Sequence, residues 1–414
     1  MRRQAQRLLA FPAPPGEEAP EAPPPGTAND YLLYLHIPFC EELCPYCSFN
    51  RIRLDEELAL RYFRALKEEM RRYRDLGYHF GAAYVGGGTP TVLPHELEAL
   101  LLLARELWPI RSLSVETNPN HLNAEILGIL KDCGVDRLSV GVQSFDDGLL
   151  RSIRRYQRFG SGREIRARLA GAQGRFRTLN VDMIYNFRGQ SESQLLGDLQ
   201  VLNELRPDQV TFYPLMGPPA RRGSYARERR FYDLIRARLA PSYSPSTAWC
   251  FSRADGSGEI SQELIDEYIV AHEEYAGLGS GSFGYLGGRL YANSFSVAGY
   301  TERLDRGLWP LASTRRYPPS QRVRYDFLMK LFGGRLDLGR LEARHGSRAM
   351  RTLAPALAFF RLAGVLRRQG RVLSLTPRGY YAWVILIREF FIGVNRLRQG
   401  CLAAHTEVRH ERPL

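Results

Sequence analysis

The stretch YLLYLHIPFCEELCPYCSFN (residues 31–50) places a largely apolar run directly before three cysteines. Cys40, Cys44 and Cys47 are spaced C-x3-C-x2-C. An apolar run of this length, bounded by Pro and Cys, is typical of a buried β-strand. The sequence therefore predicts a strand followed by a compact loop that contains three thiols. This strand and loop begin a longer repeating pattern.

Five further β-rich runs follow, separated by segments with helical periodicity. They are AAYVGGG, SLSVETNPN, VDRLSVGVQSF, TLNVDMIYNF and DQVTFYPL. Six β/α units in series argue for parallel strands joined by crossover helices, an α/β fold. Because six units are too few for a closed eight-fold barrel, we expect a partial (β/α)6 barrel.

In such folds the chemistry lies at the carboxyl ends of the strands. The unusual residues of this chain fall at those positions. The cysteines follow the first strand, and glycines Gly86 to Gly88 end the second. Glu116 ends the third, Gln143 ends the fourth, and Asp182 lies in the fifth.

The chain divides into three parts by composition. Residues 1–29 are rich in Pro, Glu and Ala, which predicts a disordered tail. Residues 30–317 carry the β/α core and its extension. Residues 318–414 contain three helical segments, the run RRQGRVLSLTPRG and a long amphipathic helix. This pattern predicts a helical, winged-helix-like domain with a two-stranded wing.

Charge and hydropathy restrict the setting of the protein. The formal net charge is +13, but the excess is almost entirely arginine spread along the chain, which does not favour nucleic-acid binding. No apolar run is long enough for a membrane span, and the N-terminus does not resemble a signal peptide. We expect a cytoplasmic protein, with contact at the inner membrane surface as a further option.

In a reducing compartment the cysteine cluster indicates metal binding or catalysis rather than disulfides. The spacing is too compact for a zinc finger, and no neighbouring Cys/His pair supplies other ligands. Three thiolates suit a [4Fe-4S] cluster whose fourth iron keeps an open position. The alternative is that the thiols are unrelated core residues.

The surrounding motifs make the cluster more specific. YLHIPFC-x3-C-x2-C, followed by GGGTPT and GVQSF, resembles the radical S-adenosylmethionine (SAM) superfamily. The chain is most similar to the branch typified by oxygen-independent coproporphyrinogen III oxidase, over residues 31–397. The resemblance implies a [4Fe-4S] cluster on Cys40, Cys44 and Cys47, with SAM bound at the open iron. It also implies reductive cleavage of SAM to a 5′-deoxyadenosyl radical, fed by an electron donor such as flavodoxin or ferredoxin.

The same resemblance assigns SAM contacts to polar and glycine positions. Glycines let the backbone approach a ligand closely, although the glycines could also form an ordinary turn. The acids at the strand ends could equally be structural caps. The residues so assigned are Tyr34, Gly86, Gly87, Thr89, Glu116, Gln143, Arg155 and Asp182.

Three departures from the oxidase pattern bear on the substrate. Phe49 stands where the oxidase has a further cysteine, and the HNxxYW motif of the heme-chaperone relatives is missing. The usual IYGLPGQ reads IYNFRGQ, with Asn186, Phe187 and Arg188 in place of Gly, Leu and Pro. This loop therefore departs from the family pattern.

Two added motifs, STAWCFSR (residues 246–253) and REFFIGVN (residues 388–395), resemble the class C radical methyltransferases. This resemblance implies two SAM molecules and methylation of an sp2 carbon, with menaquinone C8 methylation as the expected reaction. The aromatic final helix would suit a lipophilic quinone, or it could simply be the core face of that helix. The alternatives are a heme-pathway enzyme acting on a tetrapyrrole, either coproporphyrinogen oxidase-like or heme-degrading, and a non-catalytic heme chaperone.

The remaining cysteines are expected outside the cluster. Cys133 is predicted to be a buried thiol at a helix end, and Cys250 a small apolar core group that could also be catalytic. Removing residues 378–414 is expected to leave the cluster in place, because its ligands lie far upstream.

Overall fold

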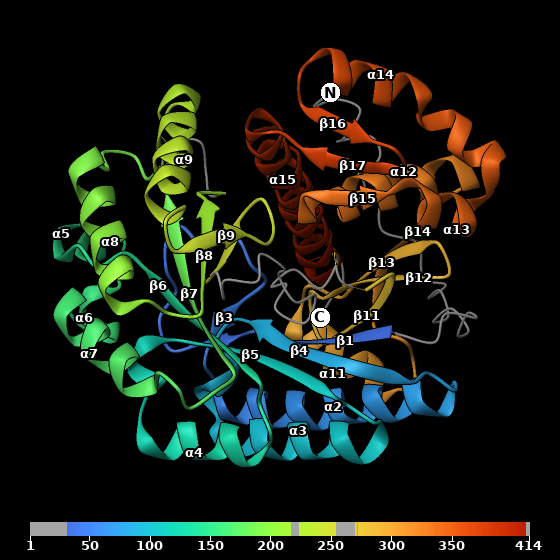
Figure 1. Cartoon of the computed structure of the whole chain (residues 1–414). Helices are drawn as coiled ribbons and strands as arrows, with labels where there is room; N and C mark the ends of the chain where they lie inside the picture. Colours follow the sequence, from blue (N-terminus) through green and yellow to red (C-terminus); the bar gives the residue numbers. More distant parts are fainter. Residues whose placement is uncertain (1–30, 217–222, 254–269, 271, 411–414) are drawn as a thin grey trace.

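The computed structural model describes residues 31–216, 223–253, 270 and 272–410. The tail predicted for residues 1–29 lies outside the described residues. Within them, strands and helices alternate from Tyr31 to the end of the sixth parallel strand, as the periodicity predicts (Figure 1).

The six predicted parallel strands are confirmed, and they lie side by side in chain order. Every residue of β1 is buried, as expected for a strand of a parallel sheet covered on both faces. The strands are β1 (Tyr31–Ile37), β4 (Phe80–Gly87), β5 (Ser112–Thr117), β6 (Arg137–Gln143), β7 (Thr178–Tyr185) and β8 (Gln209–Pro214).

Amphipathic helices connect these strands and cover the outer face of the sheet (Figure 1). Asp55 caps the first of them by accepting from the Leu58 N–H, and Ser161 and Ser191 form capping boxes that begin α7 and α8. The helices are α2 (Glu56–Asp75), α3 (Pro94–Leu107), α4 (Ala124–Asp132), α5 (Asp147–Ser152), α6 (Tyr156–Phe159), α7 (Gly162–Ala172), α8 (Glu192–Leu205) and α9 (Tyr225–Leu239).

The sheet continues beyond the six core strands at both edges, to twelve strands among the residues that the structure describes. β10 pairs antiparallel with β8 and β9 pairs antiparallel with β10, whereas β11 pairs parallel with β1 and leads to β12–β14. The added elements are β9 (Tyr243–Pro245), β10 (Cys250–Arg253), β11 (Glu274–Leu278), β12 (Phe283–Leu286), β13 (Arg289–Asn293), α11 (Val297–Asp305) and β14 (Leu311–Arg316).

The hairpin between β12 and β13 had a sequence signal that the strand prediction missed. Gly287 and Gly288 separate the two strands and have φ of 57° and 73°. Two successive positive φ angles define the tight hairpin turn for which Gly-Gly is a favoured sequence.

The C-terminal region contains the predicted helices and wing, but the wing has three strands instead of two. Its strand order is β15-β17-β16, and the third strand is only Arg335–Asp337. The elements are α12 (Pro319–Lys330), β15, α13 (Leu338–Met350), α14 (Ala354–Leu362), β16 (Leu366–Gln369), β17 (Val372–Leu375) and α15 (Pro377–His410). The domain boundary at residues 317/318 remains a prediction.

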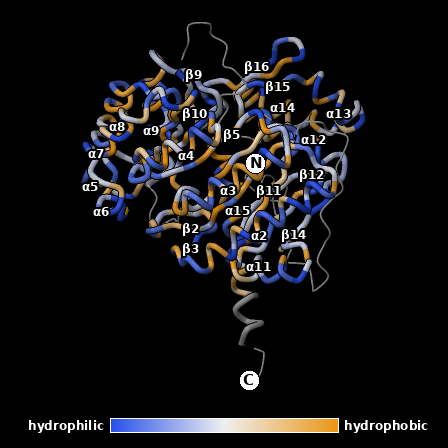
Figure 2. The backbone as a smooth tube through the Cα atoms, turned by 90° about the horizontal axis from the view of Figure 1, so that it is seen from below, coloured by the Kyte–Doolittle hydropathy of each residue, from blue (hydrophilic) through white to orange (hydrophobic). Residues whose placement is uncertain are grey.

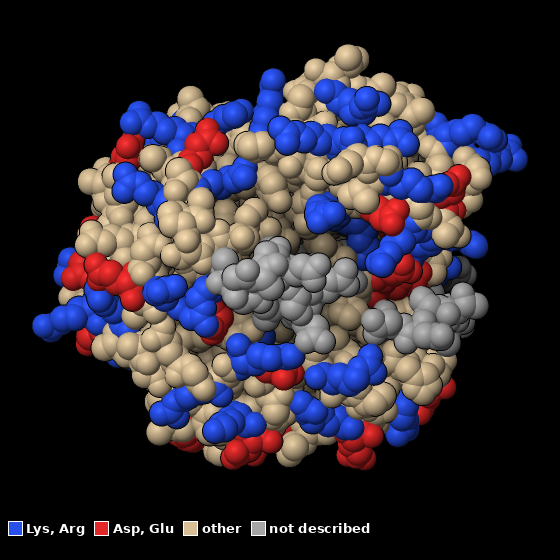
Figure 3. Space-filling model, viewed as in Figure 1, with Lys and Arg blue, Asp and Glu red and all other residues tan. Residues whose placement is uncertain are grey.

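The surface combines both signs of charge. Figure 2 shows hydrophilic stretches along outer helices such as α5 and α13, and Figure 3 shows basic side chains scattered over one face among acidic and uncharged ones. Among the described helices, none has the length and apolar character needed to cross a bilayer.

Candidate functional site

A pocket at the carboxyl ends of the core strands, called the cysteine pocket, contains most of the predicted site residues. Its lining includes Cys40, Cys44, Cys47, Gly87, Thr89, Glu116, Gln143, Arg155 and Asp182. Residues from five different strands and their loops thus meet at one edge of the sheet, because parallel strands all end on the same side. Tyr34 lies in an adjoining pocket, and Gly86 packs behind Glu116.

The cysteine loop is held by short local contacts. The Cys47 N–H donates to the Cys44 carbonyl over 3.2 Å, and the Arg51 guanidinium donates to the same carbonyl. Arg155 Nη1 lies 3.5 Å from the Cys44 Sγ. Two guanidinium groups therefore lie beside the thiols, where they would stabilise the negative charge of bound thiolates.

Burial keeps the Cys40 and Cys47 thiols protonated while no metal is bound. Desolvation raises the pKa of Cys40 to about 12, and the neighbouring Cys47 adds to the shift. Desolvation also raises the pKa of Cys47. Metal ligation releases such protons because the thiolate is the ligand.

The donor set fits a cluster better than a single ion. Among the described residues, no three His, Cys, Asp or Glu side chains are arranged to hold one metal ion. A single ion needs all its sulfur ligands at about 2.3 Å from one point, whereas a [4Fe-4S] cluster distributes its thiolates over separate irons. Three thiols spread around one pocket, with cations beside them, match the second case.

The glycines at the end of β4 are required by close packing. A Cβ on Gly86 would lie 2.8 Å from the Glu116 carboxylate, and one on Gly87, whose φ is 120°, would lie 2.7 Å from the His36 ring. Glu116 accepts from the Tyr84 hydroxyl at 2.8 Å and from the Gly87 N–H at 3.0 Å. The glycine run thus allows the strand end and the Glu116 carboxylate to lie against each other at the pocket.

Arg155 and Thr89 are joined through a residue that the sequence analysis did not single out. Asn118 accepts from Arg155 Nη2 at 2.8 Å and donates to the Thr89 hydroxyl at 2.8 Å. Thr89 Oγ1 lies 3.7 Å from the Cys40 Sγ. Asn118 follows Glu116 in the quoted VETNPN run, so its position after a strand was the available signal.

Gln143 has the strained backbone that functional sites often carry. Its φ is 75°, at an irregularity in the β6–β7 pairing. Its buried amide oxygen has no hydrogen-bond partner among the described residues, so it is available to a donor on a ligand. Asp182 faces the same pocket and accepts from Ser139 at 2.7 Å and Asn180 at 2.8 Å.

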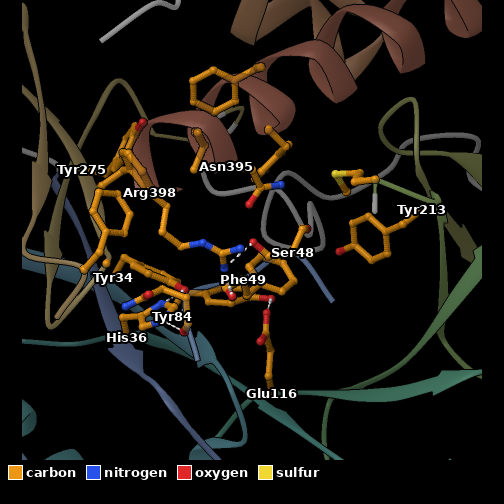
Figure 4. Close-up of a pocket in the computed structure, with 18 of the residues that line it drawn as sticks. Tyr34, His36, Ser48, Phe49, Tyr84, Glu116, Tyr213, Tyr275, Asn395 and Arg398 are labelled. Carbon is orange, nitrogen blue, oxygen red and sulfur yellow. Dashed lines mark hydrogen bonds between the residues drawn. The ribbon is translucent and has the colours of Figure 1, made fainter. Parts of the chain in front are cut away.

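A second pocket opens beside the first and is lined mainly by aromatic rings (Figure 4). The two pockets share Ser48, Phe49, Glu116, Tyr213 and Met216. The space is about 1070 Å³, the open mouth included. Its rings come from Tyr34, Phe49, Tyr84, Tyr213, Trp249, Tyr275, Phe283, Phe295, Phe390 and Phe391.

Residues of β1 and β4, including a buried histidine, line one side of this aromatic pocket. Tyr34 on β1 is paired with Tyr84 on β4. The Tyr34 hydroxyl lies 3.0 Å from His36 Nδ1, and His36 Nε2 contacts the Asn50 carbonyl at 2.8 Å. Burial lowers the pKa of His36 to about 4, so its ring is neutral at ordinary pH.

The two added motifs meet at this pocket. Trp249 of STAWCFSR packs against Phe391 of REFFIGVN, with ring centroids 5.7 Å apart. Arg388 of REFFIGVN is fully buried and donates from Nη1 to Glu228 Oε2 at 2.6 Å. Asn186 Nδ2 donates to the same Glu228 oxygen at 3.1 Å. The altered loop and the added motif are therefore joined by one buried polar network.

The other three cysteines lie outside the cysteine pocket. Cys133 is buried at the C-terminal cap of α4, as predicted. Cys250 is fully buried on β10, and Cys401 lies half-buried on α15. None of the three lines the cysteine pocket.

Comparison with known proteins agrees with this arrangement. The Radical SAM superfamily profile matches residues 34–202. The heme chaperone HemW of Bacillus subtilis is 31% identical over 326 residues, which cover 72% of this chain and 82% of HemW. The chain belongs to the radical SAM superfamily.

Within the superfamily the chain falls in the coproporphyrinogen oxidase-like branch. The oxygen-independent coproporphyrinogen III oxidase of Bradyrhizobium diazoefficiens is 28% identical over 383 residues, covering 83% of this chain and 82% of the oxidase. The solved coproporphyrinogen III oxidase HemN of Escherichia coli has the same fold, with a TM-score of 0.73 and 22% identity. The similarity covers 95% of this chain and 93% of HemN.

Membership of this radical SAM family implies a [4Fe-4S] cluster and SAM as cofactors. The expected assignment to class C methyltransferases finds no support among these relatives, and the heme-related alternative is better supported. The departures at Asn186 and in the added motifs therefore do not remove the chain from the oxidase-like branch.

Proposed function

We propose that this protein is a radical SAM enzyme that acts on a tetrapyrrole, most similar in reaction to the oxygen-independent coproporphyrinogen III oxidases. Cys40, Cys44 and Cys47 would hold the cluster. The bound cluster and SAM would supply a 5′-deoxyadenosyl radical that abstracts hydrogen. One observation carries the proposal: the cysteine pocket and the aromatic pocket share a wall, so a cofactor and a large flat ring would lie side by side.

The residues of the chain would divide the remaining tasks. Glu116, Gln143 and Asp182 offer polar atoms where SAM would lie, and Arg155 places a cation beside the Cys44 sulfur. Aromatic walls stack on a flat ring and exclude water from it. The neutral His36 holds the Asn50 carbonyl without adding a charge beneath the ring.

Methyl transfer is a second candidate, favoured by the chemistry of the aromatic pocket. Among the described residues that line it, Arg398 is the side chain with a permanent positive charge. A substrate with several carboxylates would be poorly neutralised there, whereas a lipophilic quinone such as menaquinone has none. Methyl transfer would use two SAM molecules, and the added motifs form the pocket wall.

A substrate panel under strictly anaerobic conditions tests the proposal. Reconstituted protein, dithionite and SAM are incubated separately with coproporphyrinogen III, heme and menaquinone, and products are identified by mass spectrometry. The proposal predicts decarboxylated tetrapyrrole or another tetrapyrrole product, with 5′-deoxyadenosine and without S-adenosylhomocysteine.

The other outcomes separate the alternatives. Methylated quinone together with S-adenosylhomocysteine would establish the methyltransferase and overturn the tetrapyrrole assignment. Tight heme binding, with heme passed on unchanged and no tetrapyrrole product from any incubation, would identify a heme chaperone.

A further inference from the structure

The C-terminal helix reaches the cysteine loop through one side chain. Arg398 Nη1 donates to the Ser48 carbonyl at 3.0 Å and to the Phe49 carbonyl. Ser48 and Phe49 directly follow Cys47 in the chain. Figure 4 shows the Arg398 side chain extending across the pocket toward these two residues. The last helix and the first loop, 350 residues apart, are thus in direct contact.

This part of the loop depends on side chains for its hydrogen bonds. The carbonyls of Ser48, Phe49 and Asn50 accept from Arg398, Arg398 and His36, respectively. The Ser48 contact is partly buried, and hydrogen bonds from a charged donor are among the stronger ones. Arg398 therefore holds the carbonyls of Ser48 and Phe49, whereas Asn50 is held by His36 and by its own amide, which donates to Ser280.

The position of Arg398 is in turn set by the helix that forms the pocket wall. Phe391, Val394, Asn395 and Arg398 lie at spacings of three, four and seven, on one face of α15, and all line the aromatic pocket. The preceding turns are anchored by the buried Arg388–Glu228 pair. A ligand in the aromatic pocket would contact the same helix face that carries the Arg398 contact.

We propose that Arg398 is a positioning residue that fixes the cysteine loop from the C-terminal helix. Its guanidinium holds the segment after Cys47, so that the placement of α15 in the aromatic pocket and the conformation of the loop depend on each other. α15 thereby has a role beyond forming the pocket wall. This role rests on the proposed cluster ligands, whereas the hydrogen-exchange test uses the protein without its cluster.

Hydrogen exchange of the cluster-free protein, read on peptides spanning residues 44–51, tests this directly. In Arg398→Ala the protection of that segment should fall about tenfold or more, because a charged double contact is lost from a loop with no regular structure. Arg398→Lys keeps the positive charge but places its donors on one nitrogen, and should give an intermediate value. Arg396→Ala, an exposed arginine on the same helix, is the matched control.

A second readout separates positioning from general stability. Thermal midpoints of Arg398→Ala and Arg396→Ala should agree, while the electron paramagnetic resonance spectrum of the reduced cluster should change only in Arg398→Ala. Unchanged protection of residues 44–51 in Arg398→Ala would overturn the inference. An equal loss of protection throughout the chain would also overturn it, because the effect would then be global.

Discussion

At the scale of single residues, the three cysteines make the sharpest prediction. Each of Cys40→Ala, Cys44→Ala and Cys47→Ala should abolish the broad visible absorbance of reconstituted protein, because each removes one thiolate ligand. Cys133→Ala and Cys401→Ala should leave the absorbance intact, since neither thiol lines the pocket. Loss of the absorbance in Cys133→Ala would contradict a cluster held by three cysteines.

Asn186 illustrates how a departure from a family motif can be explained physically. Its φ of 70° lies in the left-handed region, which Asn tolerates better than most residues. It also donates to the buried Glu228. Asn186→Gly loses the side-chain hydrogen bonds to Glu228, Gly223 and Arg227. Asn186→Ala loses the same bonds and should destabilise by about 1 kcal/mol more, because Ala adds backbone strain.

Urea unfolding of both variants beside the native protein measures this difference. A variant Asn186→Ala as stable as Asn186→Gly would show that the left-handed backbone carries no strain at this position.

At the scale of elements, α15 is held to α9 by a buried ion pair. Arg388→Met should destabilise the protein by about 3–5 kcal/mol, because it leaves the Glu228 carboxylate buried without its cation. The double variant Arg388→Met/Glu228→Gln should recover much of that loss. Denaturant unfolding measures both, and a single variant within about 1 kcal/mol of the native protein would contradict a structural role for the pair.

Another buried acid joins α2 to the strands added at the sheet edge. Glu69 accepts from Tyr300 at 2.6 Å, Gly279 at 2.8 Å and Asn293 at 3.0 Å. Desolvation raises its pKa to about 7, and these hydrogen bonds only partly offset the shift. The folded state therefore binds the proton more tightly than the unfolded state does, so stability falls as the pH rises from about 4.5 to 7.

Glu69→Gln should remove this part of the pH dependence. Unfolding free energies at pH 5, 6, 7 and 8 (roughly, the window around the shifted pKa) would be compared between the variant and the native protein. Asp198, whose burial also raises its pKa to about 7, remains in both and cancels in the difference. A difference that stays constant over this range would refute the titration of Glu69.

Sequence reasoning succeeded where structure is local. The C-x3-C-x2-C spacing is read directly from the sequence, and periodicity alone places Glu116 near the end of one strand and Asp182 within another. Parallel topology then brings these residues to one pocket. β15 was missed because three residues carry too little pattern. Arg398 could not be predicted, because nothing in its local sequence indicates a contact with Ser48.

At the scale of the whole molecule, the C-terminal region and the cysteine loop are not independent. Removing residues 378–414 deletes Arg398, so the proposed positioning role predicts loss of the cluster, whereas the sequence analysis predicts that the cluster is retained. The truncation also removes Phe390 and Phe391 from the pocket wall. Burial of a large apolar side chain contributes about 1.5–3 kcal/mol of stabilisation.

The truncated protein should therefore lose both substrate turnover and much of its iron on gel filtration after reconstitution. Iron and sulfide content per chain, measured beside the Arg398→Ala variant, checks this. Full iron retention by the truncated protein would mean that the loop is stable without α15.

The most direct measurement is formation of 5′-deoxyadenosine by the anaerobically reconstituted protein, given dithionite, SAM and coproporphyrinogen III, beside the Cys44→Ala variant. Radical SAM chemistry at this pocket predicts 5′-deoxyadenosine from the native protein and none from Cys44→Ala. A native protein that holds its full complement of iron and sulfide and still forms no 5′-deoxyadenosine would contradict it, as would equal amounts from the two proteins.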